Sequence, residues 1–112
     1  MGFVTIAETS RVEQFRARAE LCRVLTDPKR LLILDALRDG ERSVGELADE
    51  LGCALPNVSQ HLSLLRTAGL VKRRREGTTV YYRLAAPRIL DACEIVGEIV
   101  ARADSTPTRR PA

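Results

Sequence analysis

The spacing of apolar residues changes twice along this chain of 112 residues, and these changes limit the folds it can adopt. Up to Leu70 the apolar residues recur every three or four positions, which is typical of amphipathic helices. From Val71 to Leu84 the period is two, which is typical of strands, and after Pro87 the helical spacing returns. The sequence therefore predicts a mainly α-helical domain that contains one β-hairpin.

Residues that favour helix ends separate five helical segments. Asp27 precedes Pro28, a pattern of a capping residue followed by proline in the first turn. Ser43 with Glu46 three residues later predicts a capping box, and Gly52 is expected to end that short helix. The expected helices cover residues 10–25, 28–37, 43–51, 55–67 and 87–104, and the expected hairpin joins strands at 71–75 and 79–84.

The length and composition of the chain fit a single globular domain, since 112 residues is a common domain size and 45% of them are apolar. We expect this domain to cover residues 10–104, with a flexible arm at 1–9 and a disordered tail at 105–112. No apolar run reaches the ~20 residues of a membrane-spanning helix, and the first residues do not form a signal-peptide pattern. The sequence therefore predicts a cytoplasmic protein with no membrane partner.

Basic residues are concentrated in one part of the chain. The formal net charge of the whole sequence is only +3. Between Ala54 and Leu84 there are six basic residues against one acidic residue, so the rest of the chain carries a net charge of −2. Four of the basic residues, Lys72–Arg75, are consecutive. A basic stripe on an otherwise acidic body is typical of polyanion binding, with a merely solvated hairpin as the alternative.

The helices expected at 43–51 and 55–67 form the arrangement of a helix-turn-helix motif. They are short and joined by a tight turn at Gly52, and the second helix of such a motif enters the major groove of DNA. With Val58, Leu62 and Leu65 facing the core, polar side chains occupy the opposite face. Duplex DNA is favoured over single strands, because stacking platforms need more aromatic residues than two Phe and two Tyr.

The predicted DNA contacts lie in that second helix and in the hairpin, which would act as a wing. Ser59 and His61 flank the buried stripe, so they either reach the phosphate backbone or support the helix. His61 has no Cys or His within four residues, so a structural or DNA-facing role is favoured over a metal or catalytic one. The complete set is Asn57, Ser59, Gln60, His61, Ser63 and Thr67 in the helix, and Lys72, Arg73, Arg74, Arg75, Thr78 and Arg83 in the wing.

Four motifs stand out in the sequence: DPKRLLIL at 27–34, SVGELADELG at 43–52, VSQHLSLLRTAGLV at 58–71 and REGTTVYYRL at 75–84. Together they resemble the ArsR/SmtB family of small bacterial transcriptional repressors, and the resemblance covers residues 18–100. The resemblance implies a winged helix-turn-helix homodimer that binds double-stranded operator DNA until an inducer lowers its affinity. It also implies a dimer interface on the first and last helices, whose apolar residues include Val12, Phe15, Ala19, Ile89, Val96 and Val100.

The sequence departs from the family at the positions of its usual metal sites. It also departs at the start of the helix expected at 55–67, where Ala54 and Leu55 replace the Ser and Gln that the family often has. This change removes the usual helix cap and puts a base or phosphate contact in doubt. The usual arsenic and zinc sites are absent, so the cofactor is unknown, with a transition metal ion as one option. The positions that match those metal ligands hold Ser43, Val44, Gly45, Ala86, Arg88, Ile99 and Arg102.

The three cysteines are the remaining candidates for sensing. Cys22 and Cys93 lie on the two helices expected at the dimer interface, where a thiol pair or a soft-metal site can form. Both also fit the role of small buried apolar residues, as does Cys53. We therefore expect a repressor released by a metal ion, a metalloid or a thiol-redox signal. One alternative is a regulator controlled by a partner protein. The other is a cysteine-dependent redox enzyme, which is disfavoured because the single histidine, His61, lies in the helix expected to contact DNA.

Overall fold

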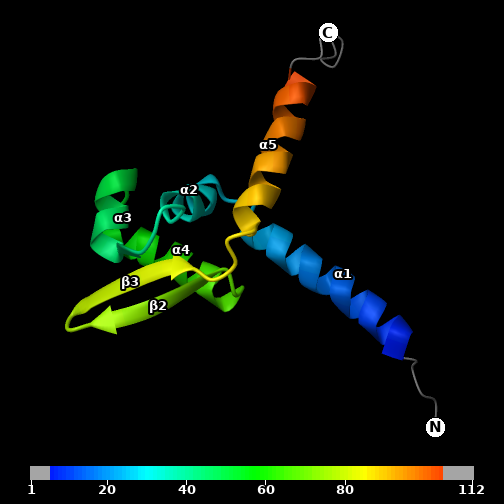
Figure 1. Cartoon of the computed structure of the whole chain (residues 1–112), viewed down its shortest axis with the longest axis horizontal. Coiled ribbons are helices and arrows are strands. Elements are labelled where there is room, and N and C mark those ends of the chain that lie inside the picture. Colours follow the sequence, from blue (N-terminus) through cyan, green and yellow to red (C-terminus); the bar gives the residue numbers. More distant parts are fainter. Residues whose placement is uncertain (1–5, 105–112) are drawn as a thin grey trace.

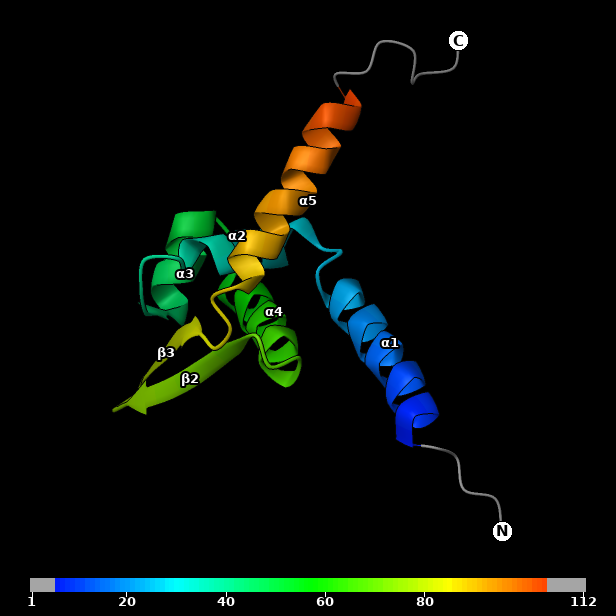
Figure 2. The same ribbon diagram turned by 45° about the vertical axis from the view of Figure 1, so that its right-hand side comes forward.

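The computed structural model describes residues 6–104, which form five helices and a small antiparallel sheet. The helices α2, α3 and α4 form a compact body, from which the β2–β3 hairpin projects (Figure 1). Helices α1 and α5 extend away from this body in different directions (Figures 1 and 2). The elements are α1 (Ile6–Val24), α2 (Pro28–Ala36), β1 (Arg42–Ser43), α3 (Val44–Leu51), α4 (Leu55–Thr67), β2 (Val71–Glu76), β3 (Thr79–Leu84) and α5 (Ile89–Asp104).

The helix ends of the body follow the capping residues of the sequence. The Asp27 side chain accepts a hydrogen bond of 2.7 Å from the backbone N–H of Lys29 at the start of α2. Ser43 Oγ accepts from the Glu46 N–H at 3.0 Å, and the Glu46 carboxylate accepts from the Ser43 N–H at 2.8 Å. Gly52 ends α3 in the left-handed conformation, with φ of 64°. The predicted capping box and helix stop are therefore confirmed.

One apolar core joins the three body helices to the sheet. The predicted stripe of α4, Val58, Leu62 and Leu65, is almost completely buried. Burial of these side chains against α2 and α3 fixes which face of α4 remains in water. The remaining buried apolar residues are Ile33, Leu34, Leu37, Leu47, Ala48, Leu70, Val71, Tyr82 and Leu90.

The sheet has three strands in the order β1-β3-β2, one more than the sequence predicts. The additional strand, β1, pairs Arg42 with Tyr82 and Ser43 with Tyr81. A strand of two residues has no readable period, so sequence spacing cannot reveal it. Its effect is to attach the hairpin to the N-terminus of α3.

The boundaries of the outer helices differ slightly from those predicted. Helix α1 begins at Ile6, four residues before the expected start at Ser10, because no Gly or Pro interrupts the intervening segment. Of the predicted arm, residues 1–5 lie outside the described residues, as does the predicted tail at 105–112. None of the described helices is both long enough and apolar enough to cross a membrane.

Candidate nucleic-acid interface

Helix α4 presents a polar face to water beside the wing. Asn57, Gln60, Ser63 and Thr67 are all exposed, opposite the buried stripe, as the helical period predicts. Ser59 is also exposed. Amide and hydroxyl groups of this kind can bond to base edges or to phosphate oxygens, so this face has the chemistry that reading a duplex requires.

His61 differs from its polar neighbours in its surroundings, because it is half-buried against α2. Its Nδ1 lies 3.4 Å from Nη1 of Arg30. The same guanidinium donates through Nε to the carbonyl oxygen of Val24, at the end of α1. His61 thus belongs to a contact that links α4 to the junction of α1 and α2, and its contact with DNA stays a prediction.

Arg74 is the one basic residue of β2 that forms an ion pair within residues 6–104. Its guanidinium donates to both carboxylate oxygens of Glu41, at 2.7 and 3.2 Å, and to Glu76 at 3.3 Å. It also lies over the ring of Tyr81, 4.7 Å from the centroid. The hydrogen bond from Arg74 holds the pKa of the Glu41 carboxyl below its usual value. The positive charge of Arg74 is therefore partly neutralised before any polyanion arrives.

The other wing cations are exposed and form no ion pair within the described residues. In the register of the hairpin, Arg73 lies opposite Tyr82 and Arg75 opposite Val80, so these two arginines share one face of the sheet. A hollow of about 400 Å³ at the base of the wing is lined by Lys72, Arg73, Arg83 and Arg66 among others. Arg66, at the end of α4, is one of the six basic residues counted in the sequence but is absent from the predicted set of contacts; the fold places it beside Lys72 in the lining of this hollow.

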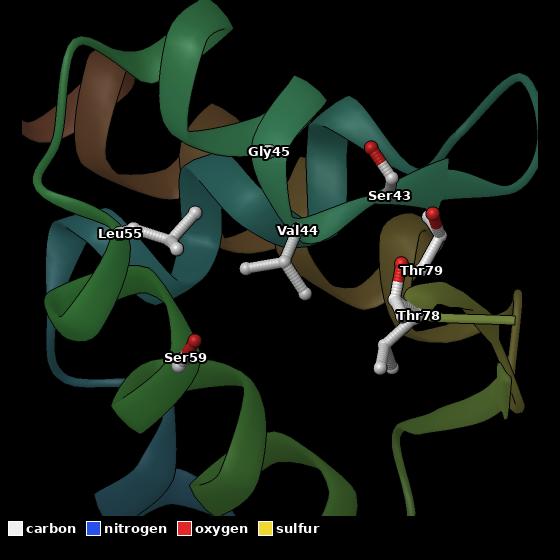
Figure 3. Close-up of a pocket in the computed structure, with 8 residues that line it drawn as sticks. Ser43, Val44, Gly45, Leu55, Ser59, Thr78 and Thr79 are labelled. Carbon is white, nitrogen blue, oxygen red and sulfur yellow. The ribbon is translucent and has the colours of Figure 1, made fainter.

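A second hollow, of about 490 Å³, lies between α4 and the tip of the wing. Figure 3 shows Leu55 and Ser59 on the α4 side, Thr78 and Thr79 on the wing side, and Val44 at the start of α3 between them. Its lining contains hydroxyl and apolar groups and no charged side chain. We call it the hydroxyl hollow; its remaining lining residues are Ser43, Gly45 and Val80.

Helices α1 and α5 carry exposed apolar residues and enclose a third hollow, of about 270 Å³. Cys22 and Cys93 both line it, so the structure brings these two predicted residues to one place. Burial raises the pKa of the Cys93 thiol, and the negative charge of Glu94 adds to this effect. Apolar side chains make up the rest of its lining, namely Leu21, Leu25, Leu31, Ile89, Ala92 and Val96.

The described residues contain no group of three or more His, Cys, Asp or Glu side chains placed to hold a metal ion. Cys22 and Cys93 therefore have no third ligand of these types beside them in this part of the chain. Two thiols match part of the ligand set that soft metal ions prefer. A complete site would need donors from elsewhere.

Comparison with known proteins identifies the family. The family model described as "Bacterial regulatory protein, arsR family" matches residues 27–73. Rv0081 of Mycobacterium tuberculosis, described as an uncharacterized HTH-type transcriptional regulator, is 38% identical over 89 residues, which are 79% of this chain and 78% of Rv0081. The chain belongs to the ArsR family of bacterial regulatory proteins. It is therefore a DNA-binding transcriptional regulator and not an enzyme.

Solved structures of similar proteins confirm the winged helix-turn-helix fold of this ArsR-family protein. The crystal structure of Rv0081 aligns with a TM-score of 0.72 at 38% identity and covers 82% of this chain and 93% of Rv0081. The solution structure of Mb0332 from Mycobacterium bovis, described as a homodimeric winged helix-turn-helix DNA-binding domain, aligns with a TM-score of 0.72 at 30% identity, with both chains fully covered.

A further relative, KmtR of Mycobacterium tuberculosis, matches this ArsR-family protein over a shorter region. It is named an HTH-type transcriptional regulator and is 52% identical over 65 residues, which are 58% of this chain. The matched region spans 50% of the length of KmtR. This likeness therefore concerns part of KmtR only.

Proposed function

We propose that this ArsR-family protein is a homodimeric repressor that binds operator DNA in the cytoplasm. Helix α4 is the reading helix and the β2–β3 hairpin holds the phosphate backbone. The observation that carries this proposal is that Lys72, Arg73 and Arg75, which form no ion pair among the described residues, lie in the strand that follows α4 and its polar face. In protein–DNA complexes, basic side chains position the protein on the phosphate backbone, and polar side chains read the base edges. The exposed cations of the wing and the polar face of α4 fit these two roles.

The apolar faces of α1 and α5 support a dimer. Val12 and Phe15 on α1 are 54% and 50% exposed, and Val96 and Val100 on α5 are 58% and 53% exposed. Large apolar side chains left in water on two neighbouring helices indicate a surface that is covered by another protein. The relative Mb0332 is homodimeric, so a second copy of this chain is the expected cover.

The wing arginines provide the test of DNA binding. We expect Arg73→Ala and Arg75→Ala each to weaken binding to all duplexes and to reduce the salt dependence of the affinity by about one unit of slope. Arg74→Ala should have a smaller effect, because Glu41 and Glu76 already neutralise part of its charge. Fluorescence anisotropy over a series of salt concentrations, with a duplex selected from a random library, measures both quantities.

Gln60→Ala is the matched variant for base readout. The Gln60 side chain is exposed on α4 and is not part of the wing, so its removal should change the preferred DNA sequence as well as the affinity. An Arg74→Ala variant with the same loss of salt dependence as Arg73→Ala, or a Gln60→Ala variant with unchanged preference, would contradict this assignment.

We further propose that the signal that releases the operator acts at Cys22 and Cys93. The support is that both thiols line one hollow between α1 and α5, the helices proposed to form the dimer. A metal ion, a metalloid or a thiol-reactive compound bound there would change how the two helices pack. Such a change would alter the spacing of the two copies of α4, and couplings of this kind usually amount to about 5- to 150-fold in affinity.

Serine variants test this sensing site. We expect Cys22→Ser and Cys93→Ser to bind the operator as tightly as the wild type but to lose the release by the active compound. Operator affinity is measured with and without zinc, nickel, copper(I), arsenite and a disulfide or persulfide donor. Cys53, outside this hollow, gives the control Cys53→Ser, which should respond normally. Release that persists in both variants would place the signal elsewhere, and a wild type that responds to no compound would favour control by a partner protein.

A further inference from the structure

Leu55 is an apolar residue in an unexpected place. It is the first residue of α4, and its side chain is 51% exposed although Val58, Leu62 and Leu65 of the same helix are buried. The apolar core ends before it reaches this first turn. The side chain of Leu55 instead lies at the edge of the hydroxyl hollow, with Ser59 one turn further along α4 (Figure 3).

The chemistry of the hydroxyl hollow differs from that of the basic wing. Its lining contains no charged side chain, whereas four basic residues follow one another in β2. Phosphate groups are positioned mainly by charged and hydrogen-bonding groups, so the apolar atoms of Leu55 and Val44 contribute nothing to holding them. A base edge fits this mixture of hydroxyl and apolar groups better than a phosphate does.

Only one base offers an apolar group in the major groove. Thymine carries a 5-methyl group there, and apolar side chains recognise it by direct contact. We propose that Leu55 contacts the 5-methyl group of a thymine in each half of the operator and thereby determines specificity at that position. The inference rests on the proposed function, since it requires α4 to lie in the major groove.

Replacement of thymine by uracil tests the contact without changing the protein, because it removes only the methyl group. In a selected duplex, each thymine is replaced in turn and the affinity is measured by fluorescence anisotropy. We expect one thymine in each half-site at which the replacement weakens wild-type binding about 3- to 10-fold, as the loss of one buried methyl group predicts. The Leu55→Ala variant should bind the duplex with thymine at that position and the duplex with uracil there with equal affinity.

Leu64→Ala is the matched control, because Leu64 is a similarly exposed leucine of α4, at 44%, that lines a separate hollow shared with α1 and not the hydroxyl hollow. It should retain the full penalty for uracil. If the wild type binds no duplex, the proposed function fails and the inference fails with it. If the wild type binds but shows no uracil penalty, or if Leu55→Ala retains that penalty, the inference alone is overturned.

Discussion

Phe15→Glu is expected to convert the dimer into a folded monomer and to lower the affinity for a two-half-site operator by about 100-fold or more. In the dimer, binding of one half-site holds the second copy next to the other half-site, and a monomer lacks this advantage. Phe15 is 50% exposed on the apolar face of α1. A charged carboxylate loses its hydration when this face is covered by a second copy, and that cost opposes association.

The neighbours of Phe15 make this substitution selective for the interface. Arg11 and Arg18 lie over its ring, at 5.2 and 4.6 Å from the centroid. Both are within one helical turn of position 15, so the new glutamate can pair with either of them and α1 remains helical. The loss of affinity should therefore come from the dimer and not from the fold of the monomer.

Sedimentation velocity and circular dichroism separate these two effects. The variant should sediment as a monomer and keep the helical signal of the wild type. Arg16→Gln is the control, since it removes only an exposed ion pair with Glu13 and should leave the dimer intact. A Phe15→Glu protein that remains dimeric, or a monomer that binds the full operator as tightly as the wild type, would contradict the assignment of this face.

Local sequence signals predict the body of the fold well. The range predicted for α4, Leu55–Thr67, agrees with the structure at both ends, because Pro56 and Gly69 limit the helix and Val58 to Leu65 set its buried side. The capping box at Ser43 is equally local. Such features need only residues within one or two turns, so a single sequence contains them.

Long-range contacts at the site could not be predicted. Glu41 is 33 positions away from Arg74, and nothing in either segment indicates that they meet. The sequence therefore presents Arg74 as equivalent to Arg73 and Arg75, whereas the fold pairs it with two carboxylates. The contact of Arg30 with His61 is likewise a product of how α2 packs on α4.

The position of Leu55 shows a different limit of sequence patterns. Its place seven residues before Leu62 gives both residues nearly the same helical phase, so phase alone does not distinguish the exposed Leu55 from the buried Leu62. The core does not extend to the first turn of α4, and the side chain is left half in water. Burial depends on what lies opposite a helix as well as on the phase of the residue.

Leu62→Ala is expected to lower the free energy of unfolding by about 2–5 kcal/mol, because it removes buried apolar atoms and leaves a cavity that the surrounding core fills only in part. Leu62 is completely buried, between Val58 and Leu65 of α4 and the core residues of α2 and α3. Small domains are stable by only about 5–15 kcal/mol, so this loss is a large share of the total.

Leu64→Ala, two residues away on the same helix, gives the matched comparison. Its side chain is 44% exposed, so removal of the same atoms should cost less than about 1 kcal/mol. Urea denaturation followed by circular dichroism measures both, at one fixed protein concentration because the stability of a dimer depends on it. Equal destabilisation by the two variants would mean that the face of α4 opposite the proposed DNA contacts does not form the core, and the orientation of the reading helix would then be wrong.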